Sequence, residues 1–280
     1  LPFQFSKFGR DDYLLVNESG EYIFLHKDEF QKLISGDMTP ESASFYDLKS
    51  RHFINTEHLP ETLEMVSAKY RTRKRFISDF TALHMMVITL KCCNACSYCQ
   101  VSAEEDNAKG FDMSTEVARR VVDYIFKSPS PSIKIEFQGG EPTLNWETLK
   151  ETVLYAEKVN QKSQKHLDFV VCTNLVKVDN RQLMFYKEHG IHISTSLDGP
   201  RSLHDKNRVL RNGDGTYDLF IKNLYQAFDV LLRGNINALM TTTIDNIAHL
   251  EEVITEYVRH GFNGIFIRSL NPYGLAVKNA

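Results

Sequence analysis

Residues 85–99 read MMVITLKCCNACSYC, an apolar, strand-like run that leads directly into a loop carrying Cys92, Cys96 and Cys99. Iron–sulfur clusters are held by cysteine thiolates, normally a full set of four. Three thiolates at i, i+4 and i+7 can therefore hold three irons of a [4Fe–4S] cluster and leave the fourth iron open. An iron without a protein ligand is a place where a small molecule can bind.

Zinc is the alternative metal for this loop, because Cys93 and Cys96 also form a C-x-x-C pair. A structural zinc site needs four closed ligands, usually including a second C-x-x-C or a pair of histidines at a characteristic distance. Here the next cysteine is Cys172, and the nearest histidines, His84 and His166, are isolated. The pattern therefore favours iron, and Cys93 is interpreted as a small buried residue beside the loop.

The composition is that of an ordinary soluble protein: of 280 residues, 42% are hydrophobic and 25% are charged. The formal net charge is −3, so the overall electrostatic attraction that drives nucleic-acid binding is missing and a nucleic acid is not expected as a partner. The basic run RTRKR at 71–75 could contact RNA or an acidic peptide, and we interpret it as a solvated linker between domains.

The cysteines and the apolar runs also bear on the cellular compartment. The five cysteines are an odd number, they are clustered, and no signal peptide precedes them, which predicts a reducing compartment, the cytoplasm. No stretch of about 18 apolar residues is present, so no membrane span is expected.

From the cysteine loop onward, strand-like runs alternate with amphipathic helical runs, the pattern of a parallel sheet covered by helices. Most of the strand candidates are near-continuous apolar runs, as expected of strands buried on both faces. They lie at 84–90, 132–138, 167–173, 191–197, 236–243 and 263–269. Six β/α repeats are fewer than the eight of a closed barrel, so we predict an α/β fold, a partial (β/α)6 TIM-like barrel over residues 81–280.

Four helical stripes between these strands are expected to face the core. They are Val117/Val121/Val122/Ile125, Leu149/Val153/Ala156, Phe220/Leu224/Ala227/Leu231 and Ile247/Leu250/Ile254/Tyr257. Gly190, Gly234 and Gly261 are expected at the left-handed position just past a helix.

Active sites of such folds lie at the carboxyl ends of the strands, and a motif follows several of the predicted strands. The second strand leads into Gln138-Gly139-Gly140-Glu141-Pro142, where adjacent glycines let a backbone approach a ligand closely or simply make a tight turn. The third strand ends at Thr173-Asn174. The fourth leads into Ser194-Thr195-Ser196-Leu197-Asp198-Gly199-Pro200, followed by His204-Asp205-Lys206-Asn207-Arg208.

These motifs, in this order, resemble the CxxxCxΦC, GGEP, SxDG and HDxxR motifs of the radical S-adenosylmethionine (SAM) superfamily, in its peptide- and protein-modifying (SPASM-type) branch. The resemblance implies a [4Fe–4S] cluster on Cys92, Cys96 and Cys99, with SAM chelating the open iron. It also implies that Gly139, Gly140 and Glu141 contact the methionine amino group.

The same resemblance assigns the remaining cofactor residues. Ser196 and Arg208 would bind the SAM carboxylate, and a hydroxyl with a guanidinium suits that task. The alternative for Arg208 is a surface ion pair with Asp205 or Asp214. Tyr98 would pack against the adenine, or serve as a core aromatic. Asp198 would orient Arg208 or the ribose, and a turn cap is the alternative for it. Thr173 and Asn174 stand where relatives carry Thr-Asn-Gly, and here Leu175 replaces the glycine, which weakens the expected role of that turn.

Residues 1–80 are expected to form a small N-terminal α+β domain, with strands at 13–16 and 22–25 around a turn and a helix near 28–34. This domain looks like the small leader-peptide-binding domain of peptide-modifying enzymes, which captures a peptide by strand addition, and a simple cap over the barrel is the alternative. The whole chain is most similar to the radical SAM maturase of His-Xaa-Ser peptide systems.

The resemblance implies an enzyme that cleaves SAM reductively, forming a 5′-deoxyadenosyl radical that removes a hydrogen atom from a precursor peptide or protein substrate, with an external electron donor. No catalytic acid or base can be named. The alternatives are a radical SAM enzyme acting on RNA or a small metabolite, and a non-catalytic, peptide-binding metal scaffold. Relatives usually continue into a cysteine-rich extension, and Cys93 and Cys172 are too few to bind a second four-cysteine cluster.

Overall fold

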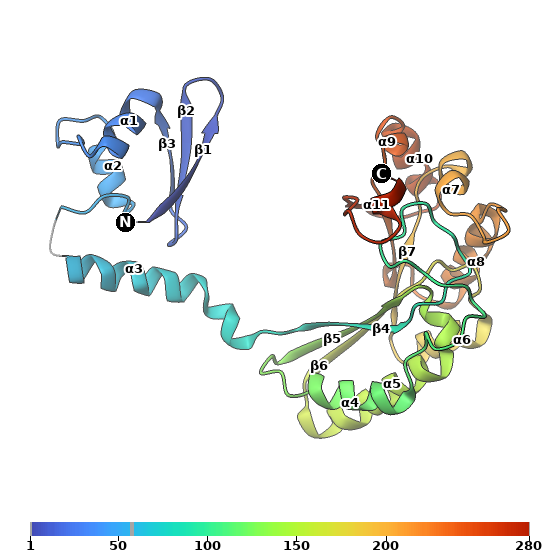
Figure 1. The fold of residues 1–280 in the computed structure, drawn as a ribbon. Coiled ribbons are helices and arrows are strands. Elements are labelled where there is room, and N and C mark those ends of the chain that lie inside the picture. The colour runs from blue at the N-terminus through green and yellow to red at the C-terminus, as the bar shows by residue number, and fades with distance from the viewer. Residues whose placement is uncertain (1, 57–58, 280) are drawn as a thin grey trace. The chain divides into compact units, whose positions relative to one another are not determined.

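The computed structural model describes residues 2–56 and 59–279, and the chain divides into two compact units, 1–80 and 81–280, each described here by itself. The N-terminal unit contains a three-stranded antiparallel sheet in the order β1-β2-β3 (Figure 1). Its strands are β1 (Phe3–Phe8), β2 (Asp12–Asn17) and β3 (Tyr22–His26). The two predicted strands are confirmed as β2 and β3, and β1 adds a third that pairs along the whole of β2.

Helices complete this small unit. They are α1 (Lys27–Ser35), α2 (Phe45–Ser50), α3 (Leu59–Arg73) and the 3-10 helix η1 (Arg75–Asp79). Helix α1 confirms the helix predicted near 28–34. Leu15, Leu25, Leu48 and Phe53 are almost fully buried and form the core of the unit. The basic run at 71–75 spans the end of α3 and the start of η1, is mostly exposed, and lies shortly before the boundary between the two units.

Residues 81–280 contain a six-stranded sheet in which every neighbouring pair is parallel and the strand order follows the chain, as predicted for a partial barrel (Figure 1). The strands are β4 (Leu83–Thr89), β5 (Ser132–Gly139), β6 (His166–Cys172), β7 (His192–Ser196), β8 (Ile236–Thr241) and β9 (Phe266–Arg268). β9 is shorter than the predicted 263–269.

Helices lie between successive strands, and the last helix follows β9. They are α4 (Thr115–Ile125), η2 (Pro142–Asn145), α5 (Trp146–Ser163), α6 (Asn180–Glu188), α7 (Arg201–Asn207), α8 (Tyr217–Val230), η3 (Arg233–Asn235), α9 (Ile244–Ile247), α10 (Leu250–Arg259) and α11 (Ala276–Asn279). Local sequence fixes their starts: Ser114 caps α4, and Asp179 with Gln182 forms a capping box on α6. Within the described ranges, no helix has the length and apolar character needed to cross a bilayer.

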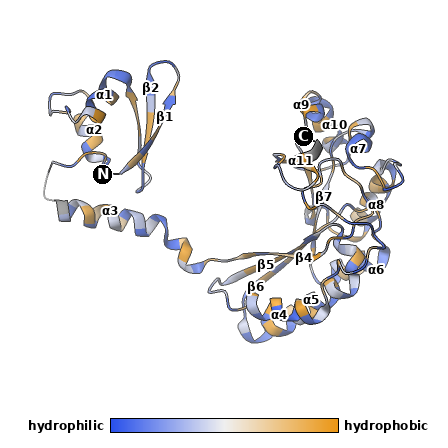
Figure 2. Cartoon of the chain, viewed as in Figure 1, coloured by the Kyte–Doolittle hydropathy of each residue, from blue (hydrophilic) through white to orange (hydrophobic). Residues whose placement is uncertain are grey.

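The strands do not bury both faces equally, which corrects the prediction that most of them are buried on both faces. On β5, Ile133, Ile135 and Phe137 are fully buried in the core that includes residues of α4 and α5, while Lys134 and Glu136 line a cavity on the opposite face. Hydrophobic and hydrophilic residues accordingly alternate around α4 and α5 (Figure 2). The alternation makes the concave face of the sheet polar enough to carry chemistry.

Two of the four predicted helical stripes are buried throughout, those of α5 and α8. The others are only partly correct. Val117 on α4 is exposed, and so are Ile247, Leu250 and Ile254. The last predicted stripe crosses the break between α9 and α10, where the helical phase is lost. Of its members Tyr257 is buried as predicted, and Val253 joins it in the core.

The predicted glycine positions are right at two of three places. Gly190 and Gly261 have φ values of 61° and 77°, as expected just past a helix. Gly234 lies inside η3, because α8 already ends at Val230 and Leu231 is extended.

Candidate functional site

The carboxyl ends of the strands surround a cavity of about 1020 Å³, and ten of the eleven residues predicted for the site line it. They are Cys92, Cys96, Cys99, Tyr98, Gly139, Gly140, Thr173, Asn174, Ser196 and Arg208. The exception is Glu141. Motifs up to 116 residues apart in sequence, from Cys92 to Arg208, are thus brought to one place by the parallel strands.

The cysteine loop is held in place by the segment that follows α7. The Ala95 N–H donates to the Val209 carbonyl at 2.7 Å, and the Ser97 N–H donates to the Asn207 carbonyl at 3.2 Å. Asn94 is buried and its N–H donates to the Cys92 sulfur at 3.4 Å. The two segments that would bind the cluster and the SAM carboxylate are therefore in direct backbone contact.

All five cysteines are free thiols, and Cys92, Cys96 and Cys99, the three predicted to bind the cluster, line the cavity. Burial raises the pKa of Cys96, and the nearby charge of Arg208 acts in the opposite direction. Among the described residues, no three Cys, His, Asp or Glu side chains converge as a single ion would require. In a [4Fe–4S] cluster each thiolate binds a different iron, so the three cysteines need not converge on one point, and the cluster stays the predicted group for this loop.

The Gly-Gly turn presses against the end of β4. A Cβ added to Gly139, whose φ is 147°, would lie 2.0 Å from the Thr89 carbonyl oxygen, and one added to Gly140 would lie 2.2 Å from that of Lys91. The Gly140 N–H donates to Thr89 at 2.9 Å. Both glycines are thus required by close backbone packing, and the same packing exposes backbone to the cavity.

Glu141 points away from the cavity into a buried hydrogen-bond network. Its carboxylate accepts the Thr143 N–H at 3.2 Å, the Thr143 hydroxyl at 2.7 Å, the Thr173 hydroxyl at 2.8 Å and the Asn174 N–H at 2.7 Å. Burial raises the pKa of Glu141, and these hydrogen bonds oppose the rise. These hydrogen bonds give Glu141 a positioning role, because they join the turns after β5 and β6. The contact of Glu141 with SAM stays a prediction.

The turn after β6 keeps the conformation that a glycine would favour. Leu175 has φ of 59° and is fully buried. Its carbonyl accepts the Asn223 side-chain amide at 2.6 Å. Asn174 extends its own amide to the sulfurs of Cys92, at 3.6 Å, and Cys93, at 3.5 Å. The turn therefore touches the cysteine loop despite the missing glycine.

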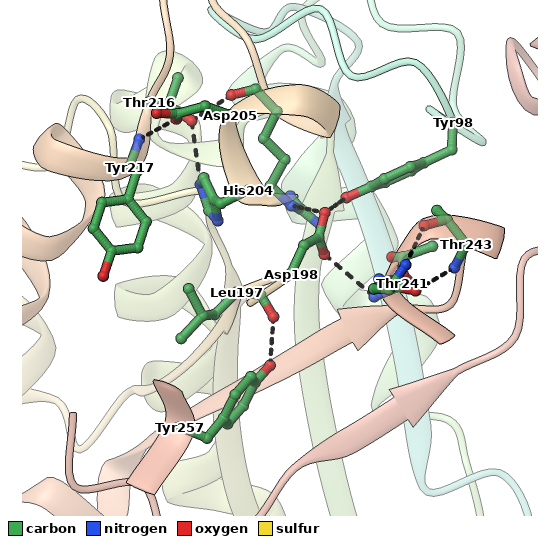
Figure 3. A network of polar contacts seen from close by, with 12 residues as sticks. Tyr98, Leu197, Asp198, His204, Asp205, Thr216, Tyr217, Thr241, Thr243 and Tyr257 are labelled. Carbon is green, nitrogen blue, oxygen red and sulfur yellow. Dashed lines mark hydrogen bonds and ion pairs between the residues drawn. The ribbon is translucent and has the colours of Figure 1, made fainter. Parts of the chain in front are cut away.

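Arg208 forms a buried ion pair with Asp198, which corrects the alternative of a surface pair with Asp205 or Asp214. Its Nε donates to Asp198 Oδ2 at 3.1 Å, and the Tyr98 hydroxyl donates to the same oxygen (Figure 3). The guanidinium carbon lies 5.4 Å from the centre of the Tyr98 ring. Burial acts to lower the pKa of Arg208, but Asp198, Tyr98 and Cys96 together raise it above its usual value, so the guanidinium stays charged. Asp198 thus orients Arg208, which is one of the roles predicted for Asp198.

Sequence reasoning missed the side chains behind this ion pair. The Thr216 hydroxyl donates to the Arg208 carbonyl at 2.6 Å and lies 3.3 Å from His204 Nε2 (Figure 3). His204 is 2% exposed, and its Nδ1 has no hydrogen-bond partner among the described residues. Burial first, and Arg208 second, lower the pKa of His204 to about 3. The HDxxR spacing indicated Arg208, whereas no signal in the sequence indicated Thr216.

A second missed contact comes from the segment after β9. The Leu275 N–H donates to the Cys99 carbonyl at 2.8 Å. Gly274 has φ of 60°, and a Cβ there would lie 2.6 Å from the same oxygen. The Asn271-Pro272-Tyr273-Gly274 sequence is a turn signal that could have suggested this close approach.

A partial parallel barrel with three cysteines, a Gly-Gly turn and a buried arginine at its mouth defines a class of metal-cluster proteins that bind a small cofactor at the strand ends. Residues 86–257 match the Radical SAM superfamily, and the chain belongs to that superfamily. The predicted family is thereby confirmed, together with its cofactors, a [4Fe–4S] cluster and SAM. The narrower resemblance to His-Xaa-Ser maturases stays a prediction.

Similar proteins include peptide- and protein-modifying enzymes. The cysteine-type anaerobic sulfatase-maturating enzyme of Clostridium perfringens is 27% identical over 188 residues, covering 64% of this chain and 50% of the relative. The structure of native anSMEcpe with bound AdoMet matches with a TM-score of 0.59 at 22% identity, over 68% of this chain and 51% of that one.

The structure of Streptococcus suis SuiB bound to precursor peptide SuiA matches with a TM-score of 0.54 at 15% identity, over 96% of this chain and 62% of that one. At this identity the likeness shows the fold alone. The chain spans about half to two thirds of the length of the first curated relatives it matches.

Proposed function

We propose that this chain cleaves SAM reductively at a [4Fe–4S] cluster bound by Cys92, Cys96 and Cys99, and thereby modifies a ribosomally made peptide or protein. The observation that carries the proposal is the single cavity in which these cysteines, the Gly-Gly turn, Ser196 and Arg208 meet. When bound, the cluster and SAM supply the electron-transfer and radical chemistry, and the protein supplies orientation and shelter.

The chain's own residues have distinct tasks in this proposal. Arg208 has several N–H donors, of which the described hydrogen bond to Asp198 uses only Nε, so the guanidinium can also receive the SAM carboxylate. Ser196 adds a hydroxyl donor from the end of β7. Gly139 and Gly140 offer backbone groups to the methionine amino group, and Tyr98 offers a ring edge or face to the adenine.

A peptide or protein substrate is supported by the relatives. Sulfatase-maturating enzymes act on a protein, and SuiB was solved with a precursor peptide. The SuiB likeness extends over both units of this chain, which is consistent with a peptide-binding role for residues 1–80. We further propose an external electron donor and a cytoplasmic setting, because free thiols that bind iron need reducing conditions.

The first experiment tests the cluster and the cleavage of SAM. After anaerobic reconstitution with iron and sulfide, the wild-type chain should show [4Fe–4S] absorption and electron paramagnetic resonance signals, and should release 5′-deoxyadenosine from SAM with dithionite. Cys92→Ala, Cys96→Ala and Cys99→Ala should each lose the cluster, while the adjacent Cys93→Ala should retain it. A cluster that forms without any cleavage, even with reductant and a candidate peptide, would contradict the enzymatic proposal and favour a scaffold.

The second experiment tests the substrate class. Candidate precursor peptides are co-expressed with the chain and measured by mass spectrometry, with the Cys99→Ala variant as the control. A mass shift that appears only with the wild-type chain supports peptide modification. Modification of RNA or of a small metabolite, with every tested peptide unchanged, would count against it.

A further inference from the structure

The concave face of the sheet carries one acidic side chain, Glu136, among the described residues that line the cavity. The cationic lining residues are Lys134, Arg208 and Arg268. Arg208 is already paired with Asp198. Glu136 lies in the middle of β5, in register with Met85 on β4 and Val170 on β6, so its immediate neighbours across the sheet are apolar.

Glu136 is held by neutral donors and by no cation in the described structure. Both donors use the same oxygen: the Cys172 thiol donates to Oε1 at 3.2 Å, and the Gln138 side-chain amide donates to Oε1 as well. The Gln138 amide nitrogen also lies 3.3 Å from the Met85 sulfur, so its orientation is fixed from two sides. Oε2 has no hydrogen bond or ion pair within the described residues. Lys134, two residues earlier on the same face, makes no ion pair with the carboxylate.

A carboxylate in this position is held in one orientation but lacks a counter-charge. Burial raises the pKa of the Cys172 thiol, and the Glu136 charge raises it further, so Cys172 remains a neutral S–H donor. A partly desolvated carboxylate with apolar neighbours is costly unless a cation or strong donors complete its shell. Glu141, a buried carboxylate in the turn after β5, has four donors. Glu136 has two, both on one oxygen.

We propose that Glu136 is a specificity-determining residue whose Oε2 receives a cationic N–H donor, a lysine or arginine side chain of the substrate, inside the barrel. This inference rests on the proposed function, since it assumes that a polypeptide side chain enters the cavity. Gln138 and Cys172 act as positioning residues that hold Oε1 and leave Oε2 facing the substrate.

The test uses small probes with the reconstituted full-length chain in the presence of SAM. Equilibrium dialysis measures binding of the blocked tripeptides acetyl-Gly-Lys-Gly-amide, acetyl-Gly-Arg-Gly-amide and the neutral acetyl-Gly-Met-Gly-amide. The wild-type chain should bind the cationic probes about tenfold to a hundredfold more tightly than the neutral one, the range of a charge-assisted hydrogen bond. Glu136→Gln, which keeps the shape but removes the charge, should abolish that preference.

Two further variants make the result specific. Asp168→Asn removes one negative charge from the neighbouring strand β6, outside the cavity lining, and should keep the preference. Lys134→Met removes a positive charge that lines the same cavity and repels the cationic probes, so it should tighten their binding. A preference that persists in Glu136→Gln, that is lost equally in Asp168→Asn, or that is absent from the wild-type chain overturns the inference.

Release of 5′-deoxyadenosine is measured on the same preparations to separate the two proposals. Cleavage of SAM without any preference for cationic probes overturns the role of Glu136 and leaves the proposed function intact. A preference that depends on Glu136, in a chain that never cleaves SAM, supports the recognition role and contradicts the proposed reaction.

Discussion

Leu175 offers a sharp test of how the site is built, because its side chain and its backbone make opposite demands. The side chain is fully buried in the barrel core, and the backbone has φ of 59°, a conformation that disfavours any residue with a Cβ. We consider two replacements, Leu175→Ala and Leu175→Gly. Both remove the buried side chain, and only glycine also relieves the backbone.

The magnitudes decide the order of stability. Removing a buried leucine side chain costs about 3 to 5 kcal/mol. A Cβ in the left-handed region costs about 1 to 2 kcal/mol. Leu175→Gly should therefore be about 1 to 4 kcal/mol less stable than the wild-type chain and about 1 to 2 kcal/mol more stable than Leu175→Ala. This order is the reverse of that in a helix or strand, where glycine is less stable than alanine by about 0.5 to 1 kcal/mol.

Urea unfolding of the metal-free chain, followed by fluorescence of the single tryptophan, measures these differences. Trp146 begins α5 and its ring packs 5.3 Å from that of Phe185, so its signal reports on the barrel unit. Leu149, fully buried in α5, supplies the matched pair Leu149→Ala and Leu149→Gly, in which glycine should be the less stable. If Leu175→Gly is no more stable than Leu175→Ala, the backbone argument is wrong.

Three more predictions concern the surroundings of Arg208 and the glycine turn. His204 has a pKa of about 3 when folded and about 6.5 when unfolded, so between these values only the unfolded chain binds the proton, and stability should fall by about 2 kcal/mol from pH 7 to pH 5. Urea unfolding at both pH values should show a smaller loss for His204→Phe. Gly140→Ala places a Cβ 2.2 Å from a backbone oxygen of the cysteine loop and should lower the iron bound per chain, whereas Gly234→Ala, in open space, should not. Asp198→Asn leaves the buried Arg208 without its counter-charge and should destabilise the chain by about 3 to 5 kcal/mol in the same unfolding assay, and an unchanged urea midpoint would refute the importance of the pair.

The sequence alone predicted the six strands, their parallel order and ten residues of the cavity lining. This was possible because the strands are marked by apolar runs and the motifs follow them directly, so a parallel sheet brings the motifs together without further information. Each strand and the motif that follows it can therefore be recognised from neighbouring residues in the sequence.

What the sequence could not predict depends on packing between distant segments. Glu141 belongs to a familiar motif, yet its direction is set by donors from the turn after β6, which no spacing reveals. Leu175 keeps a glycine-like turn because burial of its side chain outweighs the strain of its backbone. The stripe on α10 failed because a break between two short helices changes the phase of the pattern.

The backbone contacts on either side of Arg208 have a thermodynamic consequence. Ala95 and Ser97 of the cysteine loop donate to the carbonyls of Val209 and Asn207. Arg208, which would bind the SAM carboxylate, therefore lies between two residues that are hydrogen-bonded to the iron-binding loop. Binding of iron to the cysteine loop and binding of SAM at Arg208 should then be thermodynamically linked, and such linkage is reciprocal. If bound iron strengthens the binding of SAM by a given free energy, bound SAM must strengthen the binding of iron by the same amount. SAM should therefore make the iron harder for a chelator to remove.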